Sequence, residues 1–189
     1  MQERIDCICT GACPKCGDDI KRVRQQVTVT LRRENLIYDI RNCAYIESHT
    51  LAEDAGHVRH LVADIGEEGN IDRVDRVMAL AFSLLVQRLG EWTRTDLDTG
   101  LKEIDDDRWI PCEYRVKVCL PRKNNATTVA LLGHLMHEYV VTKVLYDWLL
   151  TAVPKSAEAW ATRLVEIEDE LERLTNSTDL CFRRHTSPW

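Results

Sequence analysis

The chain has 189 residues, of which 44% are hydrophobic and 30% charged, with 8 glycines, 5 prolines and a formal net charge of −6. This is the composition of an ordinary globular protein, and so few glycines and prolines favour helices over an all-β fold. No stretch reaches 18 uncharged apolar residues, which excludes a membrane-spanning helix, and we therefore expect a soluble protein.

The charge is distributed unevenly along the chain. Residues 1–33 hold seven basic and four acidic side chains, a net charge of +3, which leaves −9 for the remainder. A body this acidic should not bind a nucleic-acid backbone, because phosphates are neutralised by clustered Lys and Arg. It could line a space through which DNA passes without binding.

The first twenty residues form a separate, cysteine-rich unit. Its polar start predicts no secretory signal, so the cysteines are expected in a reducing compartment, as metal ligands or buried side chains. The segment Cys13-Pro-Lys-Cys16-Gly17 resembles half of a zinc knuckle, in which two nearby thiolates chelate one ion. With Cys7 and Cys9 as the other two ligands, the pattern predicts a closed and therefore structural zinc site. Free thiols, an iron–sulfur cluster or a redox dithiol are the alternatives.

Between residues 26 and 90 the sequence predicts one strand and three helices. Residues 26–31 alternate polar and apolar side chains and are rich in β-branched residues, as in a short strand. Apolar residues then recur at helical spacing over residues 32–51 and again over residues 56–65. Asn70 is expected to cap the third helix and Gly90 to end it. The apolar face of that helix consists of Ile71, Val74, Met78, Ala81, Phe82, Leu85 and Leu89.

A polar, acidic loop and a second strand are predicted next. Residues 91–111 form the loop, and within it residues 96–107 resemble a calcium-binding loop weakly, because the glycine and the final acid are misplaced. A solvated loop is the simpler interpretation. Residues 112–118 alternate apolar and charged side chains, which predicts a strand with one buried face. This strand is expected to pair with the strand at residues 26–31.

Two long helices complete the predicted body. The first runs from about Thr127 to Leu150, with Lys143 and Asp147 as an expected ion pair, and the second begins at Pro154. The short connection between them predicts antiparallel neighbours. The second helix has an apolar stripe at three- and four-residue spacing, formed by Ala157, Trp160, Leu164, Ile167, Leu171 and Leu174.

Together these elements predict a mainly α protein, a bundle of about four helices with a small two-stranded β element. We expect three parts: a cysteine-rich arm and strand over residues 1–31, a helical bundle over residues 32–176, and a tail over residues 177–189.

No catalytic constellation is recognisable in the sequence. His134, His137 and Glu138 could share a helix face, but no third metal ligand is indicated, and they are more simply polar residues at a helix rim. Cys43 falls on an apolar helix face and is expected to be a packing residue, although a Cys–His nucleophile remains an alternative. We therefore expect binding or assembly rather than catalysis.

The basic residues of the arm suggest a second interpretation. Beside a zinc knuckle they could contact nucleic acid, and they are Lys21, Arg22, Arg24, Arg32 and Arg33. The segment lacks aromatic residues for base stacking, so a solvated strand face is favoured. A zinc-knuckle module that contacts nucleic acid or protein through this arm is the alternative function.

Two stretches of sequence resemble helical virion proteins of tailed bacteriophages. The first, between Leu36 and Leu89, contains Asn42-Cys-Ala-Tyr-Ile-Glu and Asp72-Arg-Val-Asp-Arg-Val-Met-Ala-Leu-Ala-Phe. The second is Met136-His-Glu-Tyr-Val-Val-Thr-Lys-Val-Leu-Tyr-Asp-Trp-Leu. The layout over residues 32–189, with a helical bundle, an inserted loop and strand, and a C-terminal tail, is similar to that of head–tail connector (adaptor) proteins.

The resemblance implies a subunit of a ring at the neck of a virion, which assembles in the host cytoplasm. The ring would join the portal to the next layer of neck or tail proteins through head-to-tail contacts between identical chains. DNA would pass nearby without specific binding, and no membrane would be involved. The tail offers aromatic and arginine anchors typical of interface hot spots, namely Phe182, Arg183, Arg184 and Trp189.

Overall fold

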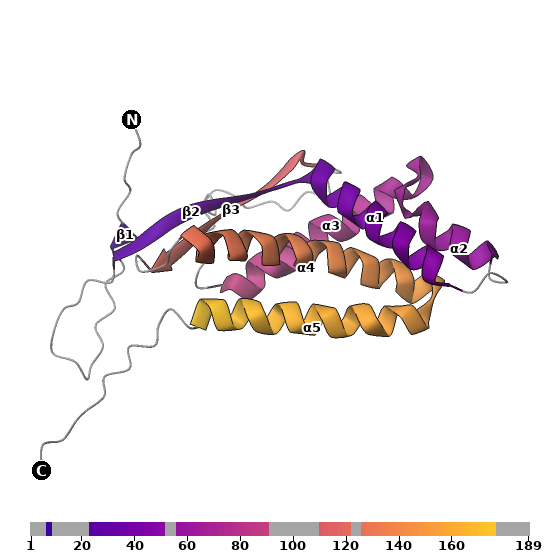
Figure 1. Cartoon of the computed structure of the whole chain (residues 1–189). Coiled ribbons are helices and arrows are strands. Elements are labelled where there is room, and N and C mark those ends of the chain that lie inside the picture. The colour runs from indigo at the N-terminus through magenta and orange to yellow at the C-terminus, as the bar shows by residue number, and fades with distance from the viewer. Residues whose placement is uncertain (1–6, 9–22, 52–55, 91–109, 122–125, 177–189) are drawn as a thin grey trace, which may run out of the picture.

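The structure is a computed structural model, and it describes residues 7–8, 23–51, 56–90, 110–121 and 126–176. The described residues form five α-helices, a short 3₁₀ helix and three strands, which confirms the predicted mainly α fold (Figure 1). In chain order these elements are β1 (Cys7–Ile8), β2 (Val23–Arg32), α1 (Arg33–Thr50), α2 (Gly56–Ala63), η2 (Asp64–Gly66), α3 (Glu68–Leu89), β3 (Glu113–Pro121), α4 (Ala126–Ala152) and α5 (Pro154–Asn176).

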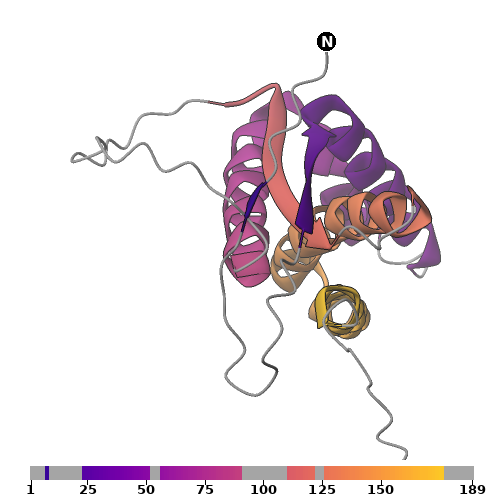
Figure 2. The ribbon, with the colours of Figure 1, turned by 90° about the vertical axis from the view of Figure 1, so that its left-hand side faces the viewer.

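The sheet is a long antiparallel ribbon. β2 pairs with β3 from Arg24 opposite Pro121 to Arg32 opposite Glu113, as predicted, and β1 adds two residues to the start of β2. Alternate side chains of both strands, such as Val29 and its partner Val116, are buried against the helices. Figure 2 shows the two long strands side by side, with α3 on one side of the ribbon and α1 on the other.

Helix α4 is the centre of the helical body. A helix that is apolar on all sides is buried on all sides, and α4 contacts α1, α3 and α5. Full burial of a Leu, Val or Met side chain stabilises the fold by about 1.5–3 kcal/mol. The fully buried side chains of α4 include Leu132, Met136, Leu145 and Leu149. Helix α5 packs antiparallel against α4, as the short connection predicted.

Two local predictions are wrong. Asn70 does not cap α3, which begins at Glu68 after an extended Glu67. The Asn70 amide instead donates a hydrogen bond of 2.9 Å to the Asp64 carbonyl oxygen of η2, because a short polar side chain readily bonds to nearby backbone. Lys143 and Asp147 do not pair with each other.

Asp147 pairs across helices with Arg73 of α3, at 3.4 Å, and the Lys143 ammonium lies 5.2 Å from the ring centre of Tyr146. Exposed pairs within one helix contribute only a few tenths of a kcal/mol, so a partner on a neighbouring helix readily replaces them. Among the described residues, no helix combines the length and apolar composition that crossing a bilayer requires.

Candidate interaction surfaces

The predicted zinc site lies almost entirely outside the described residues. Cys7 is the one predicted ligand that the structure describes, and its backbone pairs with Arg24 of β2. Cys9, Cys13 and Cys16 lie outside the described residues. So do the acidic loop at 96–107 and the predicted partner-binding residues Phe182, Arg183, Arg184 and Trp189. The pairing of β1 with β2 places the start of the cysteine arm at one end of the ribbon.

The predicted His–Glu pair on α4 is engaged by neighbouring helices. His137 Nε2 lies 2.8 Å from a carboxylate oxygen of Asp39 on α1, and Arg163 of α5 donates to Glu138 at 2.8 Å. Within the described part of the chain, no three His, Cys, Asp or Glu side chains are grouped as metal ligands. His137 and Glu138 therefore link α4 to α1 and α5.

Cys43 lies beside these ion pairs, one helical turn after Asp39 on α1. Burial raises the pKa of its thiol, and the carboxylates of Glu138 and Asp39 raise it further, while Arg163 opposes them. The thiolate is the nucleophilic form of cysteine, and these surroundings disfavour it. The geometry thus supports the packing role predicted for Cys43.

Alkylation rates test this assignment. At neutral pH, Cys43 should react with iodoacetamide much more slowly than the exposed Cys112, because a raised pKa leaves less thiolate and the side chain is partly buried. Its rate should keep rising as the pH is increased beyond the ordinary pKa of a thiol. Peptide mapping by mass spectrometry measures both residues in one sample. Faster labelling of Cys43 than of Cys112 at neutral pH would contradict the packing role.

An ion pair with a buried carboxylate joins the start of α1 to α3. Two nitrogens of the Arg33 guanidinium donate to the two carboxylate oxygens of Asp75, each at 2.7 Å, and the Asp75 side chain is 4% exposed. Tyr114 of β3 packs nearby against Phe82, and burial, followed by the Asp75 charge, raises its pKa. Because Arg33 is bound to Asp75, it is not available for the basic contact surface that the alternative interpretation assigned to it.

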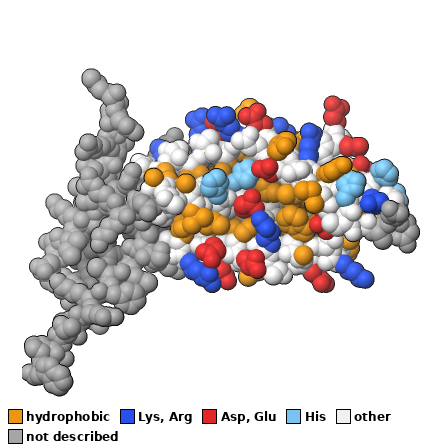
Figure 3. Space-filling view, in the orientation of Figure 1, with side chains coloured by type: hydrophobic (Ala, Val, Ile, Leu, Met, Phe, Trp, Pro, Cys, Tyr) orange, Lys and Arg blue, Asp and Glu red, His pale blue; other side chains and the backbone are white. Residues whose placement is uncertain are grey.

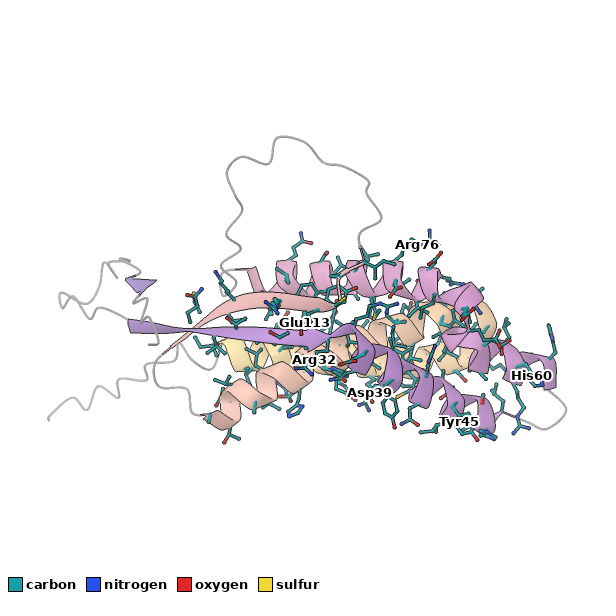
Figure 4. The ribbon with its side chains drawn as sticks, turned by 90° about the horizontal axis from the view of Figure 1, so that it is seen from above. Arg32, Asp39, Tyr45, His60, Arg76 and Glu113 are labelled. Carbon is teal, nitrogen blue, oxygen red and sulfur yellow. The ribbon has the colours of Figure 1, made fainter. Side chains whose placement is uncertain are left out.

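Helix α1 presents exposed aromatic and aliphatic side chains. Tyr38, Tyr45 and Ile46 are all more than half exposed, and the Tyr45 ring contacts that of His49 edge-on. Asp39 and Tyr45 project from α1 on the side of the molecule opposite to Arg76 of α3 (Figure 4). On the face formed by α1, α4 and α5, hydrophobic side chains form a band with charged side chains around it (Figure 3).

A second exposed apolar surface lies between α3 and α5. On α3, Leu80 is 58% exposed and Leu84 is 37% exposed, while on α5 Val165 is 54% exposed. A hollow of about 290 Å³ opens beside Leu80, where it is lined by Arg73, Arg76, Val77 and Leu80. We call the surface of Val77, Leu80, Leu84 and Val165 the α3–α5 face.

Polar contacts show how the two helices that form this face are placed. Arg73, near the start of α3, donates a hydrogen bond of 3.1 Å to Thr151 in the last turn of α4, just before α5 begins. Arg88, at the end of α3, contacts Glu168 at 3.0 Å and Glu172 at 3.3 Å in the second half of α5. The two helices therefore run in the same direction, and Figure 2 shows them on two sides of α4.

Helix geometry places Leu84 and Val165 next to the ion pair that links the two helices. Leu84 lies one turn before Arg88 on α3, and Val165 lies one turn before Glu168 on α5. Since Arg88 and Glu168 are in contact, the preceding turns of the two helices place Leu84 and Val165 on the same surface. Tyr139 of α4 is buried, and burial together with the Glu168 charge raises its pKa, while Arg88 lowers it.

The sequence also indicates this face, through apolar residues of α3 that lie outside the stripe predicted to face the core. Leu80 and Leu84 are four residues apart but lie outside the stripe predicted to face the core. Apolar residues four apart and off the main stripe indicate a second apolar surface on the same helix. Val165 is likewise outside the predicted stripe of α5.

The comparisons with known proteins add no relatives. Searches against protein-family models, curated proteins and solved structures found no match.

Proposed function

We propose that the protein is a structural subunit that associates with copies of itself and with neighbouring proteins, as a head–tail connector in the neck of a tailed-phage particle. The α3–α5 face is the observation that carries the association, because Leu80, Leu84 and Val165 stay exposed there. Clustered exposed apolar side chains with charged residues around them are typical of protein interaction sites. The phage setting is supported by the sequence resemblance.

A ring of identical subunits needs two different surfaces on each chain. In a head-to-tail contact, one surface of a subunit binds a different surface of its neighbour. Such contacts form a closed ring when a whole number of the rotations between neighbouring subunits makes a full turn. The α3–α5 face offers one such surface. The net charge of −9 beyond residue 33 is compatible with a ring through which DNA passes without binding.

Native mass spectrometry of the full chain tests this function. We expect a closed ring of many copies, with the ring population rising with protein concentration. One zinc per chain, lost on the changes Cys13→Ser and Cys16→Ser, would support the structural zinc site independently of the ring. A chain that stays monomeric at every concentration, alone and with candidate portal proteins, would contradict the connector function.

One observation favours the alternative, a zinc-knuckle module that contacts nucleic acid. The exposed face of the ribbon carries three cations, Arg32, Arg115 and Lys117, of which Arg32 and Arg115 pair with the partly buried acid Glu113. Binding to DNA or RNA whose affinity falls steeply with added salt would favour this module over the connector.

A further inference from the structure

We infer that the α3–α5 face receives residues 177–189 of a second copy of the chain, so that each subunit donates its tail to a neighbour. The inference rests on the proposed function and names the two surfaces that would join. Three observations support it: the exposed apolar side chains of the face, the charges around it, and the composition and length of the tail.

The apolar parts of the two surfaces match. The face presents Leu80, Leu84 and Val165, with a hollow beside Leu80, and the tail contains Phe182 and Trp189. Aromatic side chains that enter an apolar hollow are the usual anchors of protein interfaces. Burial of an aromatic ring there would remove apolar surface from water on both partners.

The charges match as well. The second half of α5 carries five acids, Glu166, Glu168, Asp169, Glu170 and Glu172. Asp169 is exposed and lies one turn after Val165, beside the apolar part of the face. The tail carries Arg183 and Arg184 directly after Phe182. Glu168 and Glu172 already contact Arg88, and Glu170 contacts Arg173. The two tail arginines therefore fit the α5 side of the face, near Asp169 and away from Arg73 and Arg76, which line the hollow on α3. Arginine forms strong hydrogen bonds with carboxylates.

The tail is long enough to cover the face. Helix α3 extends about 22 Å from Arg73 to Arg88 at 1.5 Å per residue. Thirteen extended residues span up to about 45 Å. Residues 177–189 can therefore leave one subunit and still cover the whole face of another.

The tail that binds the face is expected to come from a second copy and not from the same chain. To reach the face of its own subunit, the chain would have to turn back along α5 directly after Asn176. Glycine most readily supplies the left-handed conformation for such a reversal, and the sequence contains no glycine after Gly133. A tail that continues away from its own α5 requires no such turn.

A complementation experiment with full-length chains tests the inference. One variant, Leu80→Glu, changes the face, and a second, Phe182→Ser with Trp189→Ser, changes the tail. We expect each variant alone to need a protein concentration on the order of tenfold or more above that of the wild type to associate. A mixture of the two should form a one-to-one dimer, because the tail of the Leu80→Glu chain can bind the face of the tail variant. The dimer should not grow, because its remaining face and its remaining tail are the altered ones. Native mass spectrometry distinguishes these species.

Ile46→Glu is the matched control. Ile46 is 56% exposed, close to the 58% of Leu80, but it lies on α1 and outside the α3–α5 face. This variant should associate as the wild type does. Circular dichroism of every variant establishes that the fold is retained, which is expected because each substituted side chain in the helices is mostly exposed.

Each other outcome overturns the inference in a distinguishable way. Wild-type rings that persist in both variants would leave the connector function standing and exclude the face and the tail as its contacts. Self-association of the tail variant but not of Leu80→Glu would show that the face binds a second face. A wild-type monomer in which the tail cross-links only to its own subunit would show docking within one chain. A wild-type monomer without such a cross-link would count against both proposals.

Discussion

Replacing Arg33 with methionine should destabilise the protein by about 3–5 kcal/mol, the usual effect of removing one partner from a buried ion pair. The Asp75 carboxylate would lose both of its 2.7 Å hydrogen bonds while its side chain remains only 4% exposed. A loss of this size is a large part of the total stability of a small domain, which is about 5–15 kcal/mol. Urea unfolding followed by circular dichroism measures it.

The neighbouring arginine supplies the control for this prediction. Arg32 is 61% exposed and lies 3.8 Å from Glu113, so Arg32→Met should change stability by no more than about 0.5 kcal/mol. Combining Arg33→Met with Asp75→Asn should recover part of the loss, because no unpaired buried charge remains. Equal effects of Arg33→Met and Arg32→Met would show that the buried pair does not hold the start of α1 to α3.

Replacing Trp148 with alanine should cost about 3–5 kcal/mol, because the change opens a cavity beside α2. The Trp148 indole is buried, its N–H donates to the Leu61 carbonyl oxygen at 3.2 Å, and the Arg73 guanidinium lies 5.1 Å from its ring centre. Val62 and Leu149 form a small apolar cluster in the same region. Hydrogen exchange should therefore show the amides of α2 losing protection before those of α5.

The control for this prediction lies two residues further along α4. Leu150 is 48% exposed, so Leu150→Ala should alter stability by about 0.5 kcal/mol or less. Trp148→Phe should give an intermediate loss, since the ring bulk is kept while the Leu61 carbonyl loses its donor. Unchanged protection of α2 in Trp148→Ala would mean that other contacts hold this helix.

Most of the fold could be predicted because its elements carry strong local patterns. The alternation around residues 26–31 and 112–118 gave both long strands, and Pro154 marked the start of α5, since proline suits the first position of a helix. Helix starts were less predictable. Asn70 has the preferred residue type for a cap, but the carbonyl of Asp64, brought close by η2, was a partner that sequence spacing did not indicate.

The candidate surfaces were harder to predict because their contacts cross between distant elements. Arg33 and Asp75 are 42 residues apart, and nothing near either residue indicates the other. Asp147 had a suitable partner four residues away, yet it pairs with Arg73. Leu80 was visible in the sequence as an apolar residue, but its exposure depends on how α3 packs against α4.

The pairing of β2 with β3 also has a consequence for how the chain folds during synthesis. Val27 pairs with Val118, so three helices must be made before the ribbon can form. Contacts between residues far apart in sequence form slowly, and an unpaired strand with an apolar face is prone to aggregate. Ribosome-bound chains that end before Pro121 should therefore be the most aggregation-prone species, and the yield of folded protein will depend on how quickly translation passes that point.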